Sequence, residues 1–390
     1  MKKVLVFILL FSLCAFSAAY AETSPFCKLD PAVFDSESFI LIEPETDTVV
    51  IEHNADDKKP MASITKLMVL LIADEYISEG KLSPDDIVTG TAAAKATEGS
   101  RVYLDDGEKM PLDDILKSIS IPSANDAAVA LAEHISGSEG EFVKLMNKRA
   151  EKMGLTNTHY VTASGLDADG HYSTARDIAV LSKEIMLNHP LIMQHAATIS
   201  DTVRNGKFPL NNTNNLLSTY EYATGLKTGT TDGAGYCLAA TAEKNGTKLI
   251  AVLLGAPTSA DRFAEAKYLF EYAFSNFALS TVQEKGLIKD DEGQEVTAKV
   301  ARGNRLSVPL KVKKDVCVYI PPAYAGEIRS EIIIKDKLTA PIPEGTAVGK
   351  VNYYSGDTLV ASADAVTATK IKKMNIFQAF FHVMKAWLSI

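Results

Sequence analysis

The sequence predicts an α+β domain with a mainly antiparallel sheet, then a small all-β sandwich domain and a C-terminal amphipathic helix. Strand-like runs lie near both ends of the segment 22–278, and helical patterns fill the interval between them. From residue 279 to residue 367, short strand-like runs recur with turn signals between them, which is typical of a sandwich. Residues 368–390 carry apolar side chains at helical spacing.

The first 21 residues are left out of the fold because they have the pattern of a secretory signal peptide. Lys2 and Lys3 form a basic n-region, Val4 to Phe16 form an apolar h-region, and Ala19-Tyr20-Ala21 is an A-x-A cleavage signature. The apolar run is short for a membrane span. We therefore expect the chain to be exported.

The composition fits two globular domains and argues against nucleic acid as a partner. The 390 residues are 46% hydrophobic and carry a formal net charge of −9 at pH 7, so the chain as a whole would repel a phosphate backbone. The cysteines lack C-x-x-C spacing, which signals neither a disulfide framework nor a zinc site. We expect no cofactor and no metal. The cysteines are Cys14, Cys27, Cys237 and Cys317.

The first predicted elements are a β-hairpin and a buried helix. Apolar residues alternate over 38–53 around the turn-like Glu45-Thr46-Asp47. Pro60 then precedes an apolar run without glycine or proline, which favours a helix start. Ser63 and Lys66 would lie in the first turn, three residues apart on one face. Burial and the helix N-terminus would lower the lysine pKa, so that Lys66 could activate the Ser63 hydroxyl. An ordinary solvated first turn is the alternative.

Helical patterns fill the middle of the first domain. The predicted helices cover 112–118, 126–135, 141–153 and 175–187.

A loop is expected at 154–175, and Pro122-Ser123-Ala124-Asn125 breaks the helical pattern. Further on, Gly225-Leu226-Lys227-Thr228-Gly229-Thr230 precedes two apolar runs joined by Lys244-Asn245-Gly246-Thr247, a strong hairpin signal. An amphipathic helix over 260–277 completes the predicted domain.

The sandwich region carries no cluster of Ser, His or Cys, so we interpret it as a spacer or docking domain. The tail from Ile371 to Ile390 has one apolar face, which predicts a helix lying on a membrane surface rather than spanning it. A terminal helix packed on its own protein is the alternative. The apolar face comprises Phe377, Phe380, Phe381, Met384 and Leu388, with Trp387 beside them.

Three short motifs stand in order along the chain: Ser63-x-x-Lys66, Ser123-x-Asn125 and Lys227-Thr228-Gly229. Each is weak alone, since most Ser-x-Asn sequences are caps or turns. Together they resemble the serine acyl-transferases that recognise penicillin. The neighbouring sequence is similar to the low-molecular-mass D-alanyl-D-alanine carboxypeptidases over essentially the whole mature chain. The neighbouring stretches are 170–177, 211–217, 225–229 and 234–236.

The resemblance implies a β-lactamase/transpeptidase-like first domain and a role for each matching residue. Ser63 would attack the penultimate D-alanine carbonyl of a peptidoglycan stem peptide, with Lys66 as base and Ser123 as proton relay. Asn125 would hold Lys66 and the substrate amide. The remaining residues would bind the substrate's terminal carboxylate or form the oxyanion hole. They are Lys227, Thr228, Gly229, Thr230 and, where the family has a basic residue, Arg262; a solvated helix arginine is the alternative for Arg262.

The resemblance also implies inhibition by β-lactams and a location on the outer face of the bacterial cytoplasmic membrane. The chain departs from well-known members at Ala124 in the middle motif and at Thr230 after Lys-Thr-Gly, and neither change removes a catalytic group.

Other enzyme classes fit the sequence less well. A class A β-lactamase needs a loop glutamate, and residues 152–183 contain none. None of the seven histidines forms H-E-x-x-H, and Ser63 lacks the G-x-S-x-G context of Ser-His-Asp hydrolases. A module that binds β-lactams or cell wall without turnover stays open.

Overall fold

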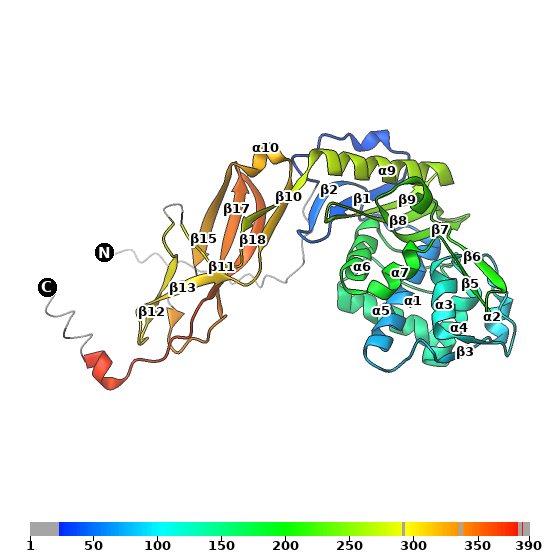
Figure 1. Cartoon of the computed structure of the whole chain (residues 1–390), viewed down its shortest axis with the longest axis horizontal. Coiled ribbons are helices and arrows are strands. Elements are labelled where there is room, and N and C mark those ends of the chain that lie inside the picture. The colour runs from blue at the N-terminus through cyan, green and yellow to red at the C-terminus, as the bar shows by residue number, and fades with distance from the viewer. Residues whose placement is uncertain (1–22, 291–292, 335–337, 381–383, 385–390) are drawn as a thin grey trace, which may run out of the picture.

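The structure is a computed structural model that describes residues 23–290, 293–334, 338–380 and 384. A larger part of sheet and helices lies beside a smaller part built of strands (Figure 1). The predicted signal peptide lies outside the described residues. The expected fold class, a transpeptidase-like domain followed by a β domain, is confirmed; the boundaries at 278 and 367 stay a prediction.

A five-stranded antiparallel sheet organises the larger part, in the order β2-β1-β9-β8-β7. Both predicted hairpins are present. Asn245 and Gly246 have φ of 52° and 80°, as a type I′ turn requires. The strands are β1 (Ser38–Glu43), β2 (Thr48–His53), β7 (Ala223–Thr231), β8 (Gly235–Lys244) and β9 (Thr247–Ala256).

The turn between β1 and β2 is built on a buried carboxylate. Glu43 has no exposed surface. Its Oε1 accepts from the Glu45 N–H at 3.0 Å, and its Oε2 accepts from the N–H and hydroxyl of Thr46 at 2.8 and 2.5 Å. Burial raises the pKa of Glu43, and these hydrogen bonds oppose that rise.

The sheet separates two hydrophobic cores, and strand β1 supplies both. Ile40 and Ile42 point into the core beneath the helices that follow β2, while Phe39 and Leu41 point into the core beneath the long helix α9. Figure 1 shows α9 along one side of the sheet and a larger group of helices, including α5, α6 and α7, on the opposite side. The helices are α1 (Lys66–Ser78), α2 (Ala92–Ala96), α3 (Leu112–Ser120), α4 (Asn125–Ser136), α5 (Glu139–Met153), α6 (Ala175–Asn188), α7 (Pro190–Ala197), α8 (Leu216–Thr219) and α9 (Ser259–Asn276).

The predicted helices correspond to α3, α4, α5, α6 and α9, with ends that differ by a few residues. The sequence pattern did not predict α7 or the small hairpin of β5 (Ser200–Val203) and β6 (Phe208–Asn211). A short pair, β3 (Ile87–Thr89) with β4 (Lys109–Pro111), lies in the stretch that sequence reasoning left mixed.

The smaller part is a β domain around its own core, which includes Val308, Leu310 and Val351. Strand β10 pairs with β14, and the main sheet has the order β15-β17-β18-β13-β12-β16, with β11 added beside β13. The elements are β10 (Ala278–Gln283), β11 (Gly286–Leu287), β12 (Thr297–Ala301), β13 (Ser307–Val312), β14 (Val316–Ile320), α10 (Pro322–Ala325), β15 (Ile328–Ile334), β16 (Leu338–Thr339), β17 (Ala347–Ser355) and β18 (Thr358–Thr367).

The chain after β18 stays attached to the β domain before it turns helical. Ile371 is buried in the β-domain core, and the Met374 N–H donates to Arg302 O at 2.9 Å. Residues 376–380 are helical, with Asn375 as cap: its Oδ1 accepts from the Gln378 N–H at 2.8 Å, and Gln378 Oε1 accepts from the Asn375 N–H at 3.0 Å.

The apolar side chains of this terminal helix are exposed, by 83% at Ile376 and 74% at Phe377. Phe381, Trp387 and Leu388 of the predicted apolar face lie outside the described residues. Within the described ranges, no helix has the length and apolar character needed to cross a membrane.

Candidate active site

The Ser63 motif lies in a tight turn rather than in the first turn of the α-helix. Ala62–Thr65 form a 3₁₀ helix, and α1 begins only at Lys66. Ala62 has φ of 48°, in the left-handed region that alanine rarely adopts. The expectation that Ser63 lies in the first turn of the α-helix is therefore wrong, because the Thr65 hydroxyl bonds Ala62 O and strand β7 packs against this tighter turn.

Strand β7 packs directly against this turn at Gly229. A Cβ on Gly229 would lie 2.8 Å from Met61 O and 3.1 Å from the Ser63 nitrogen. Glycine is required here because any side chain would collide with backbone. The close approach brings the Ser63 N–H and the strand that carries Thr230 to the same place.

Lys66 is fully buried and has three close oxygen partners. Its Nζ lies 2.8 Å from Ser63 Oγ, 2.6 Å from Asn125 Oδ1 and 2.5 Å from Ser164 O. The pKa of Lys66 is well below its ordinary value, first because of burial and second because of the Lys227 charge; the Asp126 carboxylate opposes this. The described surroundings therefore favour the neutral amine.

A neutral amine fits these partners in one arrangement only. It has two N–H groups and one lone pair, and the oxygens of Asn125 and Ser164 are carbonyl oxygens that can only accept. Both N–H groups must go to them. The lone pair then faces Ser63, whose hydroxyl donates to it, which is the geometry of a base beside its nucleophile.

The Ser123 motif lies at the start of α4, in a strained conformation. Ser123 has φ of 66° and is 5% exposed. Its Oγ has no hydrogen-bond partner among the described residues, so this hydroxyl is free to bond a substrate. Asn125 presents Oδ1 to Lys66 because its Nδ2 donates to Glu98 O at 2.6 Å.

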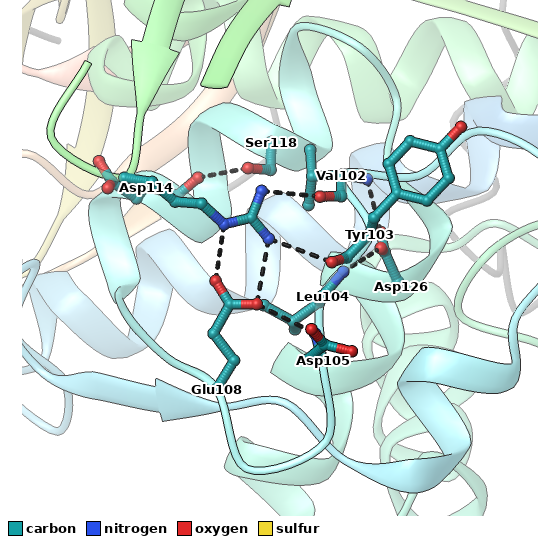
Figure 2. A network of polar contacts seen from close by, with 9 residues as sticks. Val102, Tyr103, Leu104, Asp105, Glu108, Asp114, Ser118 and Asp126 are labelled. Carbon is teal, nitrogen blue, oxygen red and sulfur yellow. Dashed lines mark hydrogen bonds and ion pairs between the residues drawn. The ribbon is translucent and has the colours of Figure 1, made fainter. Parts of the chain in front are cut away.

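The loop 98–108 that holds Asn125 is fixed from two sides (Figure 2). On one side, the Val102 and Leu104 N–H groups donate to the buried Asp126 carboxylate at 3.2 and 2.9 Å. On the other, the Arg204 guanidinium donates to Val102 O and Tyr103 O at 2.8 and 3.2 Å. It also donates to both Glu108 oxygens, at 2.6 and 3.1 Å. Arg204 lies on the unpredicted β5–β6 hairpin.

Lys227 and Arg262 form the basic side of the site. Lys227 is 1% exposed, and burial first, then the Arg262 charge, lowers its pKa to about 7. Arg262, on α9, is 6% exposed, which excludes the solvated alternative. It donates to Gly229 O at 2.9 Å and to Cys237 O at 3.0 Å, so it supports the β7–β8 backbone from behind.

Thr228 of the third motif and Thr230, which follows the motif, both lie on strand β7. Thr228 Oγ1 is 2.6 Å from Thr213 Oγ1, and Thr230 Oγ1 accepts from Arg262 at 3.2 Å. Thr213 belongs to the stretch 211–217 that the sequence comparison singled out without assigning a role. The structure thus brings together Ser63, Lys66, Asn125, Gly229, Thr230 and Arg262 through direct contacts, with Lys227 and Thr228 on the same strand.

Two residues of the loop 154–174 were missed by sequence reasoning. His171 is 6% exposed and contacts Thr65, two residues after Ser63. Asp167 accepts from the Thr231 hydroxyl at 2.7 Å and from the Gly233 N–H at 3.0 Å, which joins the loop to the β7–β8 turn. The signal for them in the sequence was position alone: His171 lies within the stretch 170–177 that resembles the carboxypeptidases, and Asp167 lies just before it.

Within the part of the chain that the structure describes, no group of three His, Cys, Asp or Glu side chains could hold a metal ion. The cysteines of that part, Cys27, Cys237 and Cys317, are free thiols.

Comparisons with known proteins agree with this geometry. A sequence profile for the family described as D-alanyl-D-alanine carboxypeptidase matches residues 26–258, and one for the C-terminal domain of penicillin-binding protein 5 matches residues 284–373. D-alanyl-D-alanine carboxypeptidase DacF of Bacillus subtilis is 33% identical over 360 residues, which are 90% of this chain and 90% of that protein. DacC of Escherichia coli is 33% identical over 95% of this chain and 91% of that protein.

Solved structures show the same likeness. Penicillin-binding protein 5 of Haemophilus influenzae has a TM-score of 0.81 at 30% identity, over 88% of this chain and 100% of that one. Penicillin-binding protein D2 of Listeria monocytogenes in its ampicillin-bound form has a TM-score of 0.57 at 32% identity, over 62% of this chain and 98% of that one.

Proposed function

This chain belongs to the D-alanyl-D-alanine carboxypeptidase family, and from that premise we propose that Ser63 is the nucleophile through which it acts. The chain is a serine D-Ala-D-Ala carboxypeptidase, a hydrolase of peptidoglycan D-Ala-D-Ala termini. The observation that carries the assignment is Lys66, a buried amine whose lone pair, among the described residues, faces the Ser63 hydroxyl.

In the proposed acylation step, Lys66 Nζ takes the proton as Ser63 Oγ bonds to the penultimate D-alanine carbonyl carbon. The C–N bond to the last D-alanine then breaks. Ser123, whose hydroxyl has no partner among the described residues, passes the proton from Lys66 to the leaving amine. Water then cleaves the ester, which restores the Ser63 hydroxyl and releases the shortened stem peptide.

The proposed oxyanion hole is formed by the Ser63 and Thr230 N–H groups. The contact of Gly229 with the Ser63 turn supports this assignment, because it holds strand and turn together. Removal of one such donor from a serine protease costs about 3 kcal/mol.

The substrate's terminal carboxylate would be held by Lys227 with the Thr228 and Thr230 hydroxyls, and Asn125 would bind the substrate amide. Arg262 would act on this subsite indirectly. Its described hydrogen bonds go to the β7–β8 backbone, the Thr230 hydroxyl and Ser259, and its charge lowers the pKa of Lys227.

A β-lactam would acylate the same serine. This proposal is supported by the likeness to Listeria penicillin-binding protein D2, whose structure contains ampicillin. The chain would work after export, on the outer face of the cytoplasmic membrane, with the β domain as spacer and residues 371–390 in peripheral contact with lipid. The A-x-A signature and the exposed Ile376 and Phe377 support that location.

The test is release of D-alanine from a peptide ending in D-Ala-D-Ala, using the full chain and Ser63→Ala. We expect steady turnover in the wild type, and neither turnover nor covalent penicillin labelling in Ser63→Ala. Labelling that persists in Ser63→Ala would show that the nucleophile is another residue. A single equivalent of D-alanine followed by none would indicate a binding module, and rapid penicillin hydrolysis a β-lactamase.

A further inference from the structure

A buried histidine outside the three motifs is connected to the nucleophile turn. His171 Nδ1 lies 3.0 Å from the Val161 nitrogen, whose N–H donates to it, and His171 Nε2 lies 2.7 Å from Thr65 Oγ1. Because Nδ1 accepts, the neutral ring must carry its proton on Nε2. The Nε2–H therefore donates to Thr65, and the Thr65 hydroxyl donates to Ala62 O at 2.7 Å.

This chain of hydrogen bonds ends on the strained residue before the nucleophile. Ala62 has φ of 48°, a conformation that persists only where its surroundings hold it. Thr65 itself lies between Ser63 and Lys66. Releasing Thr65 would let the 3₁₀ turn relax and move Ser63 Oγ away from Lys66 Nζ.

The histidine also fixes the loop that contacts Lys66 from the other side. Its Nδ1 holds the Val161 N–H, and three residues later Ser164 O accepts from Lys66 Nζ at 2.5 Å. The loop then passes so close to the turn that a Cβ on Gly165 would lie 2.1 Å from Ala62 O. One imidazole thus joins the nucleophile turn to the loop carbonyl that binds the base.

His171 cannot serve as a general base in this arrangement, since both ring nitrogens already have partners. Its neighbours are unfavourable to a charged ring. Burial first, then the charge of His159, lowers its pKa to about 4, while Asp167 on the same loop opposes this shift; a protonated Lys66 would lower it further. The ring of Tyr160 packs against it edge-on, with ring centroids 6.0 Å apart.

We propose that His171 is a positioning residue for acylation, whose neutral Nε2–H holds Thr65 and Ala62 so that Ser63 stays against Lys66. The inference rests on the proposed assignment of Ser63 as nucleophile. It gives the loop between the second and third motifs a role in positioning Ser63 and Lys66.

The test compares the full chain with His171→Leu, His171→Gln and Thr65→Val, by the rate of penicillin acylation and by kcat and KM for D-alanine release. We expect His171→Leu to lower the acylation rate and kcat about 100-fold, as small misplacements of reacting groups do, with KM little changed. Gln can accept from Val161 and donate to Thr65, so His171→Gln should recover most of the rate. Because His171 and Thr65 act as one chain, the variant His171→Leu with Thr65→Val should be no slower than the worse single variant.

The matched control is His134→Leu, on the exposed end of α4, which should leave every rate unchanged. If His171→Leu fails to fold, the pH profile of His171→Gln decides. Below about pH 4, the wild-type acylation rate should fall more steeply with decreasing pH than the rate of His171→Gln, by one additional protonation. The reason is that only the wild type can protonate residue 171.

Any of three results would overturn this inference. The first is a folded His171→Leu that is acylated at the wild-type rate, and the second is a double variant in which the losses of His171→Leu and Thr65→Val multiply. The third is an acid limb that is identical in the wild type and His171→Gln. Labelling retained in Ser63→Ala would instead overturn the proposed function.

Discussion

Two buried lysines in the site need opposite charge states for the proposed chemistry, and their surroundings provide them. Lys66 must be neutral to accept the Ser63 proton, and its pKa is lowered by burial and by the nearby Lys227 charge. Lys227 must be a cation to hold a carboxylate, and its pKa is lowered only to about 7. The cation proposed to bind the substrate therefore helps keep the proposed base unprotonated, so that the two lysines hold different charge states at one pH.

The first prediction concerns the alkaline limb of activity. The pKa of Lys227 is depressed, so its charge is lost as pH rises through about 7, and kcat/KM should fall above that pH. Arg262→Gln removes the positive neighbour, so the pKa of Lys227 should rise and the alkaline limb should move to higher pH. Arg262→Lys keeps the charge and is the control; its alkaline limb should lie at the same pH as in the wild type. Profiles of kcat/KM for D-alanine release measure this, and an unmoved limb in Arg262→Gln would refute the assignment of Lys227.

At the scale of elements, the site is held by loops that are themselves clamped from distant parts of the chain. Loop 98–108, drawn in Figure 2, is held by Arg204 of the β5–β6 hairpin. The loop that contains Ser164 is held through its own His171, which bonds Thr65, and Asp167, which bonds the β7–β8 turn. The motif residues are thus positioned by side chains that belong to no motif.

The second prediction tests the clamp by Arg204→Met. Val102 O, Tyr103 O and Glu108 lose the hydrogen bonds from Arg204, so amide exchange over 98–104 should quicken and stability should fall by about 1–3 kcal/mol. Because Asn125 bonds to this loop, kcat/KM should fall about tenfold, less than for a direct partner of Ser63. The control is Lys144→Met, which removes an exposed ion pair with Glu141 and should change neither quantity. Unchanged exchange in Arg204→Met would rule out the clamp.

The strongly periodic elements could be predicted from sequence, and the short ones could not. The Asn245-Gly246 hairpin and the helices α3 to α6 follow from local pattern. The 3₁₀ turn at Ser63 could not be predicted from local pattern, because its winding depends on the Thr65–Ala62 bond and on contact with Gly229. The motifs identified the residues of the proposed site, whereas His171 and Arg204 contact partners about 100 residues away, which local pattern cannot reveal.

At the scale of the whole molecule, the chain has a catalytic-type domain, a β domain and a short terminal helix whose apolar side chains face outward. The two domains meet through aromatic rings: Phe277 stacks on Tyr319 at 5.5 Å, and Phe26 lies 4.7 Å from Tyr324. Tyr319 is 1% exposed, so the β domain contributes to the core beneath α9. We expect the domains to support each other's stability.

The third prediction concerns the terminal helix. A chain that ends at Met374 keeps Ile371 in the β-domain core and the Met374–Arg302 bond, but lacks the apolar residues that follow. It should leave the membrane fraction, and no longer bind anionic lipid vesicles, with D-alanine release unchanged. The double variant Ile376→Glu with Phe377→Glu should behave alike in the full chain. Membrane binding unchanged in both would show that the helix does not contact lipid.

The buried Glu43 has a consequence for how the sheet assembles. All six residues of β1 are buried, and both of its faces are apolar, so hydrophobic alternation alone would tolerate a strand that slips by one residue. Such a slip would exchange the side chains of the two cores and strip Glu43 of the turn amides that satisfy it. An unsatisfied buried carboxylate is costly enough to reject that register. One acidic residue at the β1–β2 turn thus selects the register of β1, in the same five-stranded sheet whose strand β7 carries Lys227.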